Sequence, residues 1–237
     1  MLFWGRLQKS AFTSLGWSTM TKIVSPPEQR VALRTLSWET YERLLSEHGD
    51  GSSPRFTFDR GVLEIMSPSA EHERYNLMIA DLIGVLADEM DVEMLGLGAT
   101  TFKRQDLECG FEADSCFYVQ NFERVRNKER IDLATEPAPD LVIEIEITNP
   151  SINKLALFAE FGVPEVWRYD GFRLEMFQLL SGRCGAREES AAFPGVSATV
   201  LTQLLQQGKA LGRTGWLRMT RAWAHEHYGG RGGPLFT

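Results

Sequence analysis

Three acidic residues and one lysine have the types and spacing of a hydrolytic site. Glu144 and Glu146 lie two positions apart in the apolar run from Leu141 to Thr148, and Lys154 follows shortly after. Alternate residues of a β-strand point to the same face, so the two glutamates share a face opposite to a row of leucine and isoleucine side chains. Adjacent carboxylates repel each other and lose solvation when buried, and a bound metal ion would remove that cost.

Asp114 supplies a third carboxylate from an earlier predicted strand. Alternation over residues 111–119 places it on the same face as Glu112. If this strand pairs with the one containing Glu144, the carboxylates form an oxygen site of the kind that Mg²⁺ or Mn²⁺ prefers. Lys154, one turn into the next predicted helix, is placed to reach that cluster. A metal-bound water and a lysine that stabilises developing charge indicate phosphodiester hydrolysis.

The same residues allow other interpretations. A catalytically silent scaffold or regulatory module would keep such carboxylates, and the net charge of −7 favours it. A metal-free pair of carboxylates would instead perform acid–base chemistry, as in glycosidases. Asp140 fits a capping role at the strand entrance as well as it fits catalysis. His72 fits a surface or packing role better than that of a ligand.

The composition is that of an ordinary soluble globular protein and argues against several classes. The chain is 43% hydrophobic and 24% charged, and its net charge of −7 argues against binding nucleic acid by bulk charge. The 3 cysteines lack CxxC spacing and the 4 histidines are scattered. These residues predict neither a disulfide framework nor a zinc site, and they indicate a reducing cytoplasm. No apolar run approaches the roughly 18 residues that a membrane span needs.

The chain reads as one domain with an addition at each end. Residues 1–34 are expected to form an extended or disordered arm, which lacks the apolar region of a signal peptide, and translation starting at Met20 is one interpretation of it. Residues 35–210 are expected to form a single domain. Residues 211–237 are expected to form a C-terminal helix and a frayed, glycine-rich tail.

Hydrophobic periodicity within that domain predicts a mixed α/β fold. A helix is expected at 37–48, a hairpin at 55–66, and a long helix after residues 67–69, with an apolar stripe from Tyr75 to Met90. Further strands are expected at 92–103, 111–119, 141–148, 165–169, 173–180 and 185–192, and further helices at 150–161, 199–207 and 215–227.

The order of these elements and acids resembles the core of the PD-(D/E)XK nuclease superfamily. More closely, PDLVIEIEITNPSINK at 139–154 and FAEFGVPEVWRYD at 158–170 resemble the Uma-two putative restriction endonuclease family. GVLEIMSPSAEHER at 61–74 and FPGV at 193–196 share this resemblance, which covers roughly residues 35–205. It implies a restriction-endonuclease-like three-layer α/β/α core in a mixed sheet, here with an added N-terminal helix and hairpin.

The resemblance also implies roles for individual residues. Asp114 takes the position of the metal-binding aspartate, and Glu144 takes that of the acidic motif residue. Glu146 stands where a lysine is usual, and Lys154 resembles a lysine relocated to the adjacent helix. Glu71 resembles a helical glutamate that many of these nucleases add to the metal site. The implied catalytic residues are Asp114, Glu144, Glu146 and Lys154, and the implied ligands of Mg²⁺ or Mn²⁺ are Glu71, Asp114 and Glu144.

The resemblance also implies an activity and binding partners. The expected activity is that of an Mg²⁺-dependent endonuclease, and the expected substrate is nucleic acid, with DNA in first place. A homodimer suits this activity, because two symmetric sites can cut both strands of a duplex. A bacterial, cytoplasmic protein without a membrane partner is expected.

Overall fold

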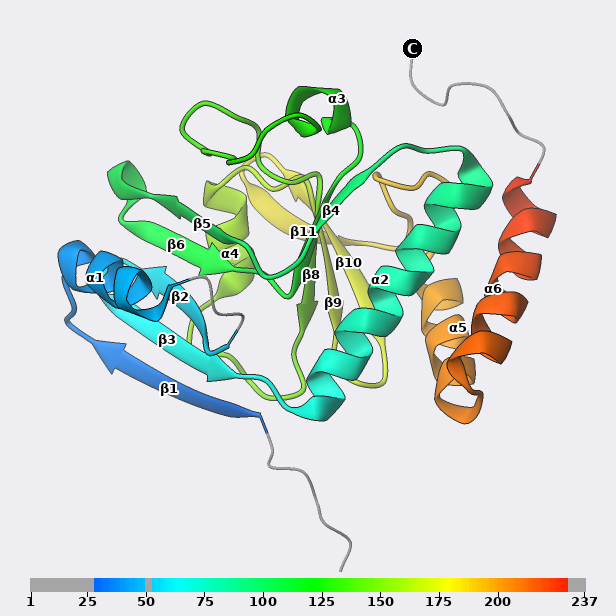
Figure 1. Cartoon of the computed structure of the whole chain (residues 1–237), viewed down its shortest axis with the longest axis horizontal. Coiled ribbons are helices and arrows are strands. Elements are labelled where there is room, and N and C mark those ends of the chain that lie inside the picture. Colours follow the sequence, from blue (N-terminus) through cyan, green and yellow to red (C-terminus); the bar gives the residue numbers. More distant parts are fainter. Residues whose placement is uncertain (1–27, 50–52, 230–237) are drawn as a thin grey trace, which may run out of the picture.

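Two β-sheets form the framework of the part of the chain that the structure describes, residues 28–49 and 53–229 of a computed structural model (Figure 1). The first sheet, sheet A, has five strands. Their spatial order is β1 (Gln29–Arg34), β3 (Val62–Ser67), β2 (Arg55–Asp59), β6 (Cys109–Glu112) and β5 (Thr101–Arg104). The second, sheet B, has six strands: β11 (Arg183–Arg187), β10 (Leu174–Leu180), β9 (Glu165–Tyr169), β8 (Leu141–Ile145), β7 (Ser115–Tyr118) and β4 (Leu95–Leu97). Sheet B is mixed, because β8 and β9 pair in parallel and its other neighbours pair antiparallel.

Helices flank both sheets. They are α1 (Trp38–His48), α2 (Ala70–Met90), the short α3 (Phe122–Val125), α4 (Lys154–Glu160), α5 (Ala198–Ala210) and α6 (Arg213–Tyr228). The start of α2 has a physical cause in the sequence. The side chain of Ser69 accepts a hydrogen bond from the amide of His72, which satisfies one of the free N–H groups at the helix N-terminus. Ser37 caps α1 in the same way.

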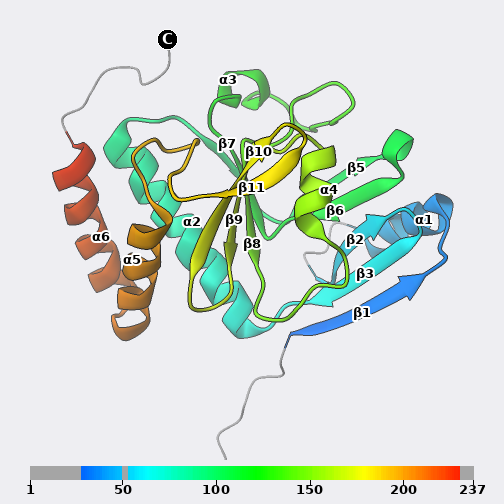
Figure 2. The same cartoon turned by 180° about the vertical axis from the view of Figure 1, so that it is seen from behind.

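Alternate residues of sheet B belong to two different apolar clusters. Leu141 and Ile143 of β8 pack with α2, α5 and α6, whereas Val142 packs with the α4 residues Leu157 and Phe158. Figure 2 shows α4 on the side of sheet B away from α2. The predicted α/β fold, with helices on both faces of a mixed sheet, is therefore confirmed.

The added N-terminal helix and hairpin belong to sheet A. The α1 residue Tyr41 stacks on Phe58 of β2 with 4.8 Å between ring centroids, and Trp38 packs edge-on against both rings. Residues 29–34 of the expected N-terminal arm form the edge strand β1. The expectations for residues 1–27 and for the tail from 230 to 237 lie outside the described residues.

The continuous strand predicted over residues 111–119 is wrong. β6 ends at Glu112 in sheet A and β7 begins at Ser115 in sheet B, so the chain passes from one sheet to the other at Ala113 and Asp114. Glu112 therefore belongs to sheet A, where its carboxylate accepts hydrogen bonds from the Phe56 amide at 2.8 Å and from the Thr101 hydroxyl at 2.6 Å. The predicted strand at 92–103 is divided in the same way between β4 and β5.

Other boundaries differ by a few residues. β8 ends at Ile145, so Glu146 lies just beyond the strand, and α4 begins only at Lys154, capped by the side chain of Asn153. The last two helices are longer than the periodicity predicts. Among the described residues, no helix combines the length and the apolar character needed to cross a membrane.

Candidate active site

The passage of the chain between the sheets brings Asp114 next to Glu144. Ser115 of β7 pairs with Ile143 of β8 in antiparallel register, and the carboxylate of Asp114 accepts a hydrogen bond from the amide of Ile145, the residue after Glu144. The side chains of Asp114 and Glu144 are almost fully buried. Two buried acidic residues thus lie near the end of β8.

Lys154 neutralises one of these carboxylates. Its Nζ lies 2.5 Å from Oε2 of Glu144, and the two side chains are 4% and 2% exposed. The second oxygen of Glu144, Oε1, is buried and has no hydrogen-bond partner among the described residues. A buried carboxylate oxygen without a donor is costly, so this atom is an open acceptor in the site.

Asp114 is fully engaged by protein donors. Its Oδ1 accepts a hydrogen bond from Nη1 of Arg55 and lies 2.9 Å from Nε2 of His72. Its Oδ2 accepts a hydrogen bond of 2.6 Å from the amide of Ile145, at the end of β8. Its backbone oxygen accepts a further bond from Asn76 on α2. Elements of both sheets and of α2 therefore fix this residue.

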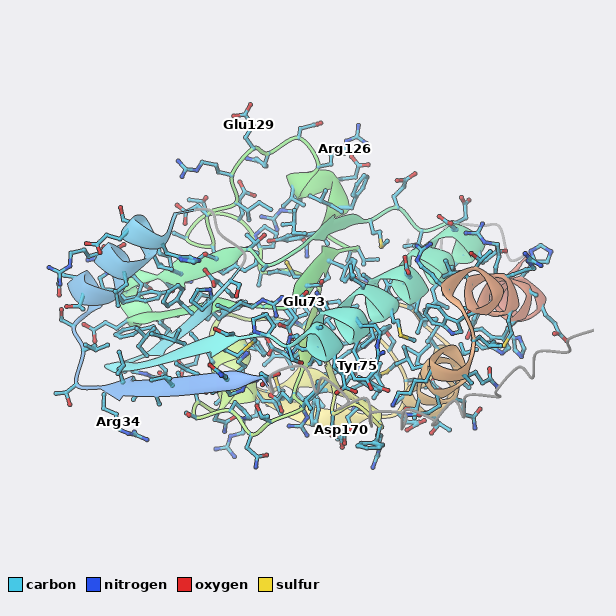
Figure 3. All side chains as sticks on the ribbon, turned by 60° about the horizontal axis from the view of Figure 1, so that its bottom comes forward. Arg34, Glu73, Tyr75, Arg126, Glu129 and Asp170 are labelled. Carbon is cyan, nitrogen blue, oxygen red and sulfur yellow. The ribbon has the colours of Figure 1, made fainter. Side chains whose placement is uncertain are left out.

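Arg55 connects the start of β2 to α2. Besides Asp114, its guanidinium contacts Oε1 of Glu73 at 2.7 Å. Figure 3 shows Glu73 near the first turns of α2, beside the strands of sheet A. Arg55 itself is buried, and only Glu73 is substantially open to solvent. A cation is thus placed between a buried carboxylate and an exposed one.

A second group of charges adjoins the site from β1. Glu28 lies 2.6 Å from Nδ1 of His72, accepts a 2.7 Å hydrogen bond from Arg30, and accepts another from the hydroxyl of Thr148. Burial alone would raise the pKa of Glu28. The hydrogen bonds from His72 and Thr148 and the charge of Arg30 outweigh burial and lower the pKa to about 2.

Arg30 and Glu64 fix the connection between β8 and α4. The guanidinium of Arg30 donates to Glu64 on β3 at 2.6 Å and to the hydroxyl of Thr148 at 3.0 Å. Glu64 in turn accepts a hydrogen bond from the backbone amide of Ser151. Because Lys154 follows directly in α4, these contacts determine where its ammonium group meets Glu144.

The remaining predicted residues have different surroundings. Glu146 is half-buried and lies 3.6 Å from Arg168. Burial and the neighbouring charge of Glu144 raise its pKa. Glu71 is exposed on α2, where it accepts a hydrogen bond from Tyr75 and lies 3.7 Å from Arg74. The structure thus joins Glu144 to Lys154, holds Asp114 at the neighbouring Ile145 amide, and keeps Glu71 at the surface.

No group of three or more histidine, cysteine or carboxylate side chains in residues 28–49 and 53–229 is arranged to hold a metal ion. Asp140, which the sequence left between capping and catalysis, has the contacts of a cap. Its carboxylate accepts hydrogen bonds from the amides of Val119 and Asn121 at 2.8 and 2.9 Å. It therefore holds the loop after β7 rather than the carboxylate pair.

The sequence pattern does not predict the charged neighbours of the site. The burial of His72 has a signal in the sequence. His72 precedes Tyr75 by three positions and Ile79 by seven, so it continues the apolar stripe of α2. Its burial fits the expected packing role, but its contacts with Asp114 and Glu28 were not foreseen. Likewise, Glu64 interrupts an otherwise apolar strand, which is an unusual place for a solvated acid.

Comparisons with known proteins relate the chain to a family of putative nucleases. Residues 38–211 match the model of the Uma2 family, described as putative restriction endonuclease. The crystal structure of a putative nuclease belonging to DUF820 from Anabaena variabilis is similar to this chain, with a TM-score of 0.49 and 12% sequence identity. That similarity covers 77% of this chain and 99% of the other. None of the curated proteins matches this sequence.

Proposed function

Because the chain belongs to the Uma2 family of putative restriction endonucleases, we propose that it is a metal-dependent endonuclease that hydrolyses phosphodiester bonds of DNA. The family match spans most of the chain and supports a nuclease. The observation that carries the finer proposal is the buried Glu144–Lys154 pair, in which the oxygen Oε1 of Glu144 has no donor among the described residues.

The donor set fits a small divalent cation. Mg²⁺ typically binds proteins through one or two carboxylates and keeps several waters, so the open oxygen of Glu144 is a suitable first ligand. Asp114 is the proposed second ligand, through Oδ1 once Arg55 releases it. The role of Glu71 as a further ligand of Mg²⁺ or Mn²⁺ stays a prediction.

A bound ion would polarise a phosphoryl oxygen and lower the pKa of a bound water. The side chains of this chain supply the other parts of the reaction. Lys154, held by Glu144 at the start of α4, stabilises negative charge that develops on the phosphoryl group. Glu146 is the proposed general base, because its raised pKa brings it closer to neutral pH than an ordinary carboxylate.

A cavity with basic side chains in its lining supports nucleic acid as the substrate. The cavity, of about 510 Å³, is lined by Thr101 and Glu112, next to the sheet junction, and by Arg126, Lys128, Glu129 and Arg130 from the loop after α3. Figure 3 shows Arg126 on this protruding loop. Basic side chains at the edge of a cavity bind phosphates and position a nucleic acid. The homodimer and the cytoplasmic location stay predictions that accompany this proposal.

One observation favours a second candidate function, a catalytically silent scaffold on the same fold. Both carboxylate oxygens of Asp114 already have protein donors, from Arg55, His72 and the amide of Ile145. If Arg55 stays paired with Asp114, these residues form an ion-pair network without a metal ion. The two candidates differ in whether a metal ion displaces this cation.

A cleavage assay tests the proposal directly. The protein is incubated with supercoiled plasmid DNA and, separately, with RNA in Mg²⁺ or Mn²⁺. Loss of DNA cleavage in Glu144→Gln and Lys154→Met would support the assigned site. The control is Lys103→Met, which removes a lysine from an exposed pair with Glu42 at 2.7 Å. Absence of cleavage of either substrate with both ions would overturn the proposal in favour of the scaffold.

A further inference from the structure

A line of buried contacts leads from the N-terminal strand of sheet A to the carboxylate pair. Glu28, the residue before β1, contacts Nδ1 of His72 at 2.6 Å, and Nε2 of the same ring lies 2.9 Å from Asp114. The side chains of Glu28, His72 and Asp114 are at most 1% exposed. The imidazole is thus held between two carboxylates in the protein interior.

This geometry fixes the ring on both sides. A carboxylate at one ring nitrogen of a histidine sets the orientation in which the other nitrogen meets its partner. The backbone amide of His72 is also held by the cap residue Ser69, so the base of the side chain is fixed by the start of α2. His72 therefore meets Asp114 from a direction that depends on Glu28.

Glu28 also contacts residues other than His72. Its other oxygen accepts hydrogen bonds from Arg30 and from Thr148, which lies in the connection between β8 and α4. One carboxylate is therefore linked to Asp114 through His72 and to the segment that precedes Lys154. Glu28 and Arg30 both lie before residue 38, where the match to the family begins.

We propose that Glu28 and His72 are positioning residues for Asp114, so that the segment before the family-matched region completes the site. Neither residue touches the scissile phosphate. Their part is to hold the Asp114 carboxylate at the amide of Ile145, the residue that follows Glu144. The inference rests on the proposed function for what Asp114 does, but the placement of its carboxylate is measurable without substrate or metal.

The amide of Ile145 reports on that placement, because it donates to Oδ2 of Asp114 at 2.6 Å. Hydrogen exchange at this amide is measured by NMR in the metal-free full-length protein, with Ile145→Val used to assign the signal. In Glu28→Gln we expect exchange at least tenfold faster than in the unmodified protein. The matched control is Glu89→Gln, which alters the exposed contact of Glu89 with His225 at 2.9 Å and should leave the rate unchanged.

His72→Gln supplies a second variant in case Glu28→Gln does not fold. Exchange at the unmodified rate in a folded Glu28→Gln or His72→Gln protein would overturn the inference, as would an equal acceleration in Glu89→Gln. A second measurement, the Kd for Mn²⁺ alone, should rise about tenfold or more in Glu28→Gln, which is typical for loss of a group that orients a metal ligand. If the unmodified protein binds no Mn²⁺, the metal in the proposed function fails, while the exchange rates still decide how Asp114 is held.

Discussion

Nζ of Lys154 lies 2.5 Å from Oε2 of Glu144, and neither side chain exposes more than 4% of its surface. The pair joins the first residue of α4 to the end of β8 across the interior. Breaking a buried ion pair on one side leaves an uncompensated charge, whereas replacing both partners with neutral groups is much less costly. The pair can therefore be tested by stability as well as by activity.

Lys154→Met is expected to lower the free energy of unfolding by about 3–5 kcal/mol, because Glu144 then lacks any donor in the interior. The double variant Lys154→Met, Glu144→Gln should recover a large part of this loss. Urea denaturation at pH 7 measures both. In the exposed pair with Glu42, Lys103→Met should cost about 1 kcal/mol or less. A loss equally small for Lys154→Met would contradict the buried pairing.

The depressed pKa of Glu28 predicts a specific pH dependence of stability. Its folded pKa of about 2 lies below its ordinary value of 4.5, so the folded protein binds this proton more weakly than the unfolded chain. The resulting stability is present above pH 4.5 and is lost as the pH falls toward 2. The contribution is on the order of 3 kcal/mol. Denaturation curves from pH 6 to 2 should show a steeper loss for the unmodified protein than for Glu28→Gln, and parallel curves would refute the assignment.

Metal binding to the carboxylates should appear as thermal stabilisation. An ion that binds only the folded protein adds about 2.7 kcal/mol when its concentration is 100 times Kd. For a chain of this length that corresponds to a rise in Tm of about 5–10 °C. We expect Mn²⁺ to produce such a rise in the unmodified protein and none in Glu144→Gln. An equal rise in both would place the ion elsewhere.

Substitution by alanine is expected to have opposite effects on stability at two helical glycines. A Cβ at Gly84 in α2 would meet no atom within 4 Å, so Gly84→Ala should stabilise the protein by up to about 1 kcal/mol. A Cβ at Gly208 in α5 would lie 2.6 Å from Cε of Met78 and 2.9 Å from Nε1 of the buried Trp216. Gly208→Ala should therefore destabilise it by roughly 1–3 kcal/mol. Thermal melts of both variants measure the difference, and a stabilised Gly208→Ala would show that α5 and α6 are less closely packed.

The sequence predicts best what is decided locally. The apolar stripe of α2 and the caps Ser37 and Ser69 depend on neighbours within one or two turns, and these helices begin where the sequence indicates. The sequence also predicts that Asp114 approaches Glu144 if their strands pair, and β7 does pair with β8.

The charged neighbours of the site could not be predicted in this way. The contact between Arg30 and Thr148 joins residues 118 positions apart, and nothing in the local pattern at either position indicates the other. The alternation of polar and apolar residues also fails to predict the strand boundaries within residues 111–119. Every residue of β6 and β7 is buried, so the alternation of polar and apolar residues does not mark a solvent-facing side and does not show where one strand ends and the next begins.

The passage from β6 to β7 has a mechanical consequence. Only Ala113 and Asp114 separate β6 of sheet A from β7 of sheet B, so one of the short covalent connections between the two sheets contains a site residue. A change in the angle between the sheets must rotate the backbone at this connection. A long rigid ligand lying across both sheets would thereby alter the separation of the Asp114 and Glu144 carboxylates without touching either one.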